Sequence, residues 1–192
     1  MINKFYKIIL FSIIIFVISC QKVEKFEKEI FDFNLLPNIM FNAEGKNIIS
    51  LYEENFEEPF YDHSLDKKPI EYLKELLDNN FHTEGINNYL EIKIIDASLK
   101  KYEIPNTESS RFQEKIIFMY EINFMLEFSL YDDSNFFLSS TIVESKRTIT
   151  SSKFISLMQS DRIIEILINN SLRDLSKKSE ELLKIYMSEY LL

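Results

Sequence analysis

Glycine is almost missing from this chain of 192 residues, in which Gly45 and Gly85 are the only two. Loops that cradle phosphate groups need several closely spaced glycines, because their backbone must approach the anion without a Cβ. The dinucleotide motif G-x-G-x-x-G, the Walker-type loop and the nucleophile elbow G-x-S-x-G are therefore all absent. We expect no nucleotide cofactor, and no cofactor of another kind.

Groups for metal binding and catalysis are equally scarce. Two histidines provide neither a three-histidine zinc site nor an H-E-x-x-H motif. Asp62, His63 and Ser64 are triad residue types, but neighbours along a chain cannot face one another as base and nucleophile must. Glu121 and Glu127, six residues apart on one predicted strand, would be roughly 20 Å apart, too far for a glycosidase pair. We expect no metal site and no enzymatic activity.

Positive charge is in deficit, with a net charge of -9. A chain this acidic, without a basic stripe, is not expected to bind nucleic acid. An anionic lipid surface would repel it, so charge does not attach it to a membrane. Carboxylates crowd residues 53–62, but the spacing and the glycine of a calcium-binding EF-hand are missing, and we expect a solvated acidic loop.

A short apolar run lies at the N-terminus. Lys4 and Lys7 precede the run from Ile8 to Ile18, which is interrupted only by Ser12. As a helix the run would cover about 16 Å, short of a bilayer core of roughly 30 Å. The pattern is typical of a signal peptide, which we place at residues 1–19.

The next residues, Val17-Ile18-Ser19-Cys20, resemble the lipobox of bacterial lipoproteins. The resemblance implies that a diacylglycerol is joined to the Cys20 thiol, that the peptide is cut before it, and that the new amino group is acylated. Cys20 is the only cysteine, so an intramolecular disulfide is excluded. By the sorting habit of this family, Gln21 in place of Asp favours the outer over the inner membrane. The resemblance thus implies a lipid-anchored, periplasm-facing protein of the bacterial envelope.

The stretch from Ile116 to Leu130 has the strongest pattern in the chain. Every second residue is apolar or aromatic, and the residues between are largely polar. A period of two predicts a strand with one face in a core, here about 50 Å long. The alternating positions are Ile116, Phe118, Tyr120, Ile122, Phe124, Leu126, Phe128 and Leu130.

Shorter elements precede this strand. We expect a strand over residues 48–52 and a helix that begins at Pro69, a residue favoured in a first helical turn. A second strand follows over residues 89–100. Its apolar parity switches at Ile94-Ile95, where we expect a β-bulge.

Two elements follow the strand from Ile116 to Leu130. The polar sequence Asp132-Asp133-Ser134-Asn135 predicts a turn, and residues 136–149 a returning strand. The spacing of apolar residues over 154–191 predicts a helix of some 30 residues, capped by Ser151 or Ser152. A weak point at residues 169–171 could bend this helix.

Together these elements predict an α+β fold. The order is β-α-β-β-β-α, with one mainly antiparallel sheet and two helices packed on one face. The domain should span residues 48–192, after a lipidated cysteine and tether at 20–47 whose apolar part, 31–41, lies on the domain.

Taken with the lipobox, this order is similar to that of the LPS-assembly lipoproteins and the auxiliary lipoproteins of ABC-type transport systems. The most similar part is the long strand, the acidic turn and a returning strand with Ser145-Lys146-Arg147. The resemblance implies a non-enzymatic accessory or assembly subunit of an LPS or lipid transport complex, with an envelope protein as partner.

One face of the predicted central strand is a candidate partner surface. Ile117, Met119, Glu121 and Met125 form a half-apolar set, which suits adaptable contacts but also fits an ordinary solvated sheet face. The alternative function is a lipoprotein that binds a lipid or small ligand between sheet and helices. An excess of aromatic residues permits this and equally fits a packed core: Phe118, Phe124, Phe128, Phe136 and Phe137.

Overall fold

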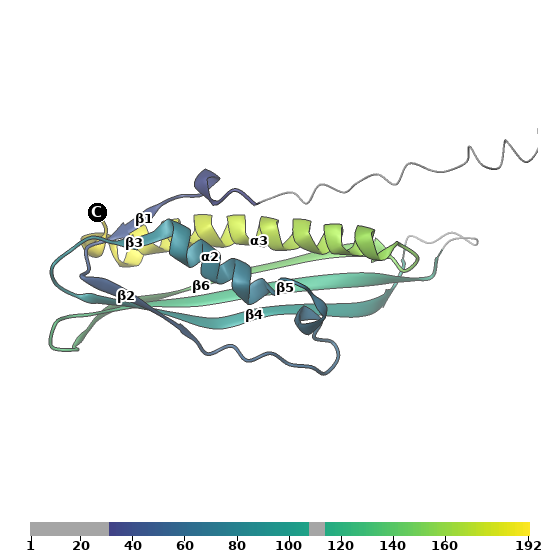
Figure 1. Ribbon diagram of the computed structural model, residues 1–192, viewed down its shortest axis with the longest axis horizontal. Helices are drawn as coiled ribbons and strands as arrows, with labels where there is room; N and C mark the ends of the chain where they lie inside the picture. Colours follow the sequence, from purple (N-terminus) through teal and green to yellow (C-terminus); the bar gives the residue numbers. More distant parts are fainter. Residues whose placement is uncertain (1–30, 108–113) are drawn as a thin grey trace, which may run out of the picture. The chain divides into compact units, whose positions relative to one another are not determined.

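A four-stranded sheet with two helices on one of its faces makes up most of the structure, a computed structural model that describes residues 31–107 and 114–192 (Figure 1). Two strand pairs are antiparallel and one is parallel, so the predicted α+β class and mainly antiparallel sheet are confirmed. In sheet order the strands are β2 (Gly45–Ser50), β4 (Tyr89–Pro105), β5 (Ile116–Tyr131) and β6 (Phe137–Ser152).

The two helices connect and cover the strands. Helix α2 (Pro69–Asn80) joins β2 to its parallel neighbour β4, and α3 (Leu157–Tyr186) follows β6 and runs along the sheet (Figure 1). Two three-residue strands, β1 (Ile39–Phe41) and β3 (Phe81–Thr83), form a small parallel pair that the sequence analysis did not anticipate. Three short 3-10 helices complete the secondary structure: η1 (Phe33–Leu35), η2 (Asp62–Ser64) and η3 (Ser188–Tyr190).

The core lies between the helices and β5, as the two-residue period predicts. Phe124 and Leu126 are fully buried, as are Leu172 and Leu175 of α3. Ile116 and Phe118 are the exceptions among the eight alternating residues, because their end of β5 is incompletely covered: Ile116 is 44% exposed and Phe118 is partly buried. Two of the aromatic residues assigned to a core or a cavity also lie outside it: Phe136 and Phe137.

The predicted bulge in β4 is confirmed. The register of β4 against β5 shifts between Ile94 and Asp96, which leaves Ile95 as the extra residue. Ile94 and Ala97 are both fully buried, although their positions differ in parity. The bulge thus lets one long strand keep its apolar side chains in the core.

Helix α3 begins later than predicted. Ser151 and Ser152 do not cap it, because both still pair with β5 at Phe118 and Ile117. Ser156 is the cap instead, and its Oγ accepts a hydrogen bond from the Gln159 backbone N–H. The Gln159 side chain in turn accepts from the Ser156 N–H, which completes a capping box.

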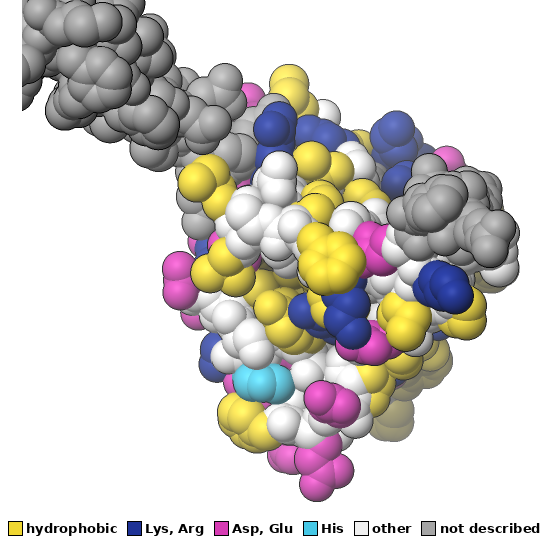
Figure 2. All heavy atoms as spheres, turned by 90° about the vertical axis from the view of Figure 1, so that its right-hand side faces the viewer, with side chains coloured by type: hydrophobic (Ala, Val, Ile, Leu, Met, Phe, Trp, Pro, Cys, Tyr) yellow, Lys and Arg dark blue, Asp and Glu magenta, His cyan; other side chains and the backbone are white. Residues whose placement is uncertain are grey.

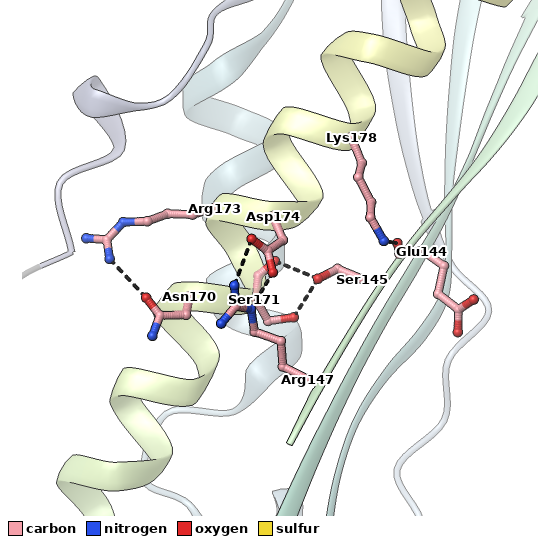
Figure 3. A network of polar contacts seen from close by, with 8 residues as sticks. All are labelled: Glu144, Ser145, Arg147, Asn170, Ser171, Arg173, Asp174 and Lys178. Atoms are coloured by element: carbon pink, nitrogen blue, oxygen red, sulfur yellow. Dashed lines mark hydrogen bonds and ion pairs between the residues drawn. The ribbon is translucent and has the colours of Figure 1, made fainter. Parts of the chain in front are cut away.

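The middle of α3 passes close over β6 through polar contacts (Figure 3). The buried Ser145 hydroxyl donates to the Ser171 carbonyl at 2.9 Å, and the small side chains allow this close approach. Residues 169–171 stay within the helix and do not interrupt it. At the exposed edge, Lys178 Nζ donates to the Glu144 carbonyl at 3.0 Å. A charged side chain thus covers part of an edge that could otherwise pair with another chain.

The segment from residue 31 to residue 41 lies on the domain, as its apolar composition predicts. Phe31 and Leu36 are buried, and Asn80 Nδ2 donates to the Phe33 carbonyl at 2.9 Å. The other end of the chain closes over the same region, where Phe41 bridges to Leu191. The predictions for residues 1–30, including the lipidation of Cys20, lie outside the described residues.

Candidate functional site: the open face of the sheet

The helices leave the second face of β4, β5 and β6 uncovered, and we call it the open face. The four candidate partner residues all lie on it, because they occupy odd positions of β5 while the even positions enter the core. Each is partly buried by its neighbours: Ile117, Met119, Glu121 and Met125. Whether a partner binds there stays a prediction.

Only two of the four belong to one apolar cluster. Ile117 is paired in register with Ile104, and Met119 with Tyr102. Directly opposed residues of neighbouring strands put their side chains on the same face, about 5 Å apart. We define the apolar cluster of the open face as these two residues and their partners on β4, that is, Ile117, Met119, Ile104 and Tyr102.

An ion pair lies between this cluster and Met125, and a second group of ion pairs lies beyond Met125. Glu121 pairs with Lys146 at 3.1 Å, and this hydrogen-bonded contact raises the pKa of Lys146. Lys93 contacts both Glu91 and Glu127 at 3.2 Å, and hydrogen bonds to these two carboxylates raise its pKa. Both glutamates of β5 therefore serve as ion-pair partners.

Of the residues considered for catalysis, Asp62, His63 and Ser64 together form the short helix η2. The Tyr52 hydroxyl donates to Asp62 at 2.6 Å, and burial is the main cause of the raised pKa of Tyr52. Asp62 is 1% exposed, so this member of the acidic loop is buried rather than solvated. His82 Nε2 lies 2.9 Å from the Asn79 carbonyl, far along the chain from His63.

Among residues 31–107 and 114–192, no three His, Cys, Asp or Glu side chains are grouped so that they could hold a metal ion. No helix in the same part of the chain is long and apolar enough to cross a membrane.

A second surface lies at the end of the domain where α3 begins. Lys101 Nζ lies 4.0 Å from the ring centre of Phe118 and 4.8 Å from that of Tyr61. Figure 2 faces this end and shows hydrophobic side chains (yellow) among Lys and Arg (blue). Phe154 and Leu157, 86% and 74% exposed, project beside α3. This end combines cations and apolar surface in a chain that is acidic overall.

Sequence reasoning missed a third surface, at the opposite end of the open face. Tyr89, Tyr131 and Phe137 stand in register across β4, β5 and β6. The Tyr131 and Phe137 rings meet edge to face, with centroids 6.1 Å apart. The sequence analysis assigned Phe137 to a core or a cavity, and only the register brings the three rings together.

The comparisons with known proteins bear on this architecture. No family model and no curated protein sequence matches the chain. Two solved structures that resemble it are both lipoproteins. One is rare lipoprotein B from Shewanella oneidensis, with 12% identity, a TM-score of 0.40 and coverage of 74% of this chain and 96% of that chain. The other is a minor lipoprotein from Acinetobacter baumannii, with 7% identity, a TM-score of 0.41 and coverage of 78% and 94%.

Proposed function

We propose that this protein is a lipid-anchored lipoprotein of the bacterial envelope that docks to a protein partner and catalyses no reaction. Cys20, at the end of a lipobox, is the anchor, and the domain faces the periplasm, at the outer rather than the inner membrane. Transport of LPS or another lipid is the process that we infer for the complex. The observation that carries docking is the half-apolar open face.

The start of the described chain bears on which side of the domain is free for a partner. Phe31, the first described residue, lies on the helix side, where its ring centre is 5.3 Å from the Arg173 guanidinium carbon. A flexible tether of the predicted kind reaches roughly 15–30 Å. The described chain thus begins on the helix side, and the open face is on the other side of the sheet.

The composition of the apolar cluster supports docking over plain solvation. Tyr102 and Met119 are residue types that interfaces favour, and both are only partly buried in the isolated domain. The ion pair of Glu121 with Lys146 beside them provides a polar border. An apolar centre with a polar rim is the usual anatomy of a protein interface.

Photocrosslinking in intact cells tests this function. A photoreactive residue replaces Met119 in one variant and Lys177, which is exposed on α3, in a second. We expect one discrete adduct with an envelope protein from position 119 and none of the same mass from position 177. The same adducts from both positions, or none from either, would contradict docking through the open face.

A second candidate function is the binding of an anionic amphiphile, which the end of the domain around Lys101 favours. The layer between the sheet and α3 is filled by side chains such as Phe124 and Leu172, so such a ligand would bind at the end of the sheet. Lys153 lies there over the Phe118 ring, at 5.6 Å. A stoichiometric lipid that copurifies with the domain, and is lost on Lys101→Glu, would favour this function.

A further inference from the structure

The far end of the open face carries an exposed aromatic shelf, which we define as Tyr89, Tyr131 and Phe137. Tyr89 is 44% exposed and Phe137 is 59% exposed. With strands about 4.8 Å apart, the row crosses three strands over roughly 10 Å. Such a row is wide enough for one extended chain to lie along it.

Gly45 extends the shelf to the edge strand β2. It is paired with Tyr89, and a Cβ at Gly45 would lie 3.2 Å from the Tyr89 ring. The tyrosine ring therefore rests over the glycine backbone. In this arrangement an aromatic ring compensates for a glycine in a neighbouring strand. Two further exposed apolar side chains flank the row: Ile86 and Phe136.

The loops around the shelf are rich in carboxylates. They are residues 42–45, 84–88, 131–137 and 187–192, and none of them contains a lysine or an arginine. One hydrogen bond, from the Asn88 backbone N–H to Asp133 Oδ1 at 2.9 Å, joins two of these loops. The acidic residues that they contribute are Glu44, Glu84, Asp132, Asp133 and Glu189.

We propose that the aromatic shelf binds a basic, partly apolar segment of a protein partner. Arginine and lysine are attracted both to carboxylates and to the faces of aromatic rings. Exposed Tyr and Phe supply large contact areas and lose little conformational freedom on binding. This inference adds the aromatic shelf to the open face as a site of the proposed docking function. Its test needs neither the lipid anchor nor the apolar cluster.

Peptide binding to the purified full-length chain carrying Cys20→Ser provides the test. The probe is a fluorescent nine-residue peptide of alternating leucine and arginine, and glutamate replaces arginine in the control peptide. We expect saturable binding of the arginine peptide, weakening as salt rises from 50 to 300 mM, roughly as screening predicts, and no binding of the control.

Variants locate the site. Phe137→Ser and Tyr89→Ser each weaken binding of the arginine peptide about tenfold, as loss of an interface anchor does. Phe56→Ser, at an exposed aromatic residue of the acidic loop, is the matched control and leaves the affinity unchanged. Both shelf side chains are largely exposed, so the substituted chains keep their melting temperature.

Three results would overturn the inference. One is equal binding of the arginine and glutamate peptides, and another is arginine-peptide binding that the shelf substitutions do not alter. The third is tighter, shelf-dependent binding of the neutral sugar chitotetraose, which would identify a saccharide as the occupant. Failure of the crosslink at position 119 would leave these measurements unaffected.

Discussion

The hydroxyl groups of Tyr120 and Ser160 lie 2.9 Å apart inside the core and join the central strand to the first turns of α3. Tyr120 is 1% exposed and Ser160 8% exposed. Each hydroxyl is the hydrogen-bonding partner of the other, so neither is buried unsatisfied.

A double-mutant cycle should therefore detect coupling between these residues. We expect Tyr120→Phe and Ser160→Ala each to lower the free energy of unfolding by about 1–2 kcal/mol, since each leaves one buried hydroxyl without its partner. The double variant should lose less than the sum, with a coupling energy of about 0.5–1.5 kcal/mol. Urea titration measures all four proteins, and strictly additive losses would contradict the contact.

Substitutions on the two faces of β5 should differ in cost. Phe124→Ala removes a fully buried ring and should lower the free energy of unfolding by about 3–5 kcal/mol. Asn123→Ala, on the open face, removes a hydrogen bond of 2.9 Å to Asp96 and should cost about 1 kcal/mol. Similar losses in chemical denaturation would show that the strand register is wrong.

Stability should fall in alkaline solution because of Tyr72. Burial is the main cause that raises its pKa to about 12, with nearby carboxylates adding to it. The ordinary pKa of tyrosine is about 10, so above that pH the unfolded chain loses this proton while the folded chain keeps it. The unfolded state then binds fewer protons, and this contribution to stability declines from about pH 10 to about pH 12.

Tyr72→Phe should flatten that decline by up to about 1.4 kcal/mol per pH unit. The wild-type chain, measured at the same pH values, is the control. The measurement is urea denaturation at several pH values. An unchanged slope in the Tyr72 variant would refute the assignment.

Lipidation of Cys20 can be followed with labelled palmitate. The wild-type chain should incorporate the label and sediment with membranes, because acyl chains contribute about 0.8 kcal/mol per buried CH₂. Cys20→Ser should lose the label and leave the membrane fraction. A variant that keeps both properties would show that the lipobox is not used.

The main elements could be predicted because their signals are local. The two-residue period of β5 and the helical spacing of α3 depend only on neighbouring residues, and so does the parity switch at Ile94-Ile95. Three-residue strands such as β1 carry no period, and their pairing is decided by contacts distant in sequence. Even the α3 cap was misplaced, because Ser151, Ser152 and Ser156 are equally good caps by residue type.

The candidate site was predicted in part for the same reason. Alternation placed Met119 and Met125 on one face but could not reveal the ion pair of Glu121 with Lys146 between them. Burial of Asp62 depends on Tyr52 reaching across from another segment, which no local pattern encodes. The aromatic shelf depends on a register irregularity between Leu130 and Tyr131.

The contacts of β1 have a consequence for the order of folding. The Leu192 backbone N–H donates to the Met40 carbonyl at 2.9 Å, and the Asn42 N–H donates to Tyr190 at 2.8 Å. Residues 40–42 can therefore pair with the C-terminal segment only after residues 190–192 have been synthesised. Contacts this distant in sequence raise the contact order and slow folding. A chain exported through its signal peptide would make these contacts only after residues 190–192 had crossed the membrane.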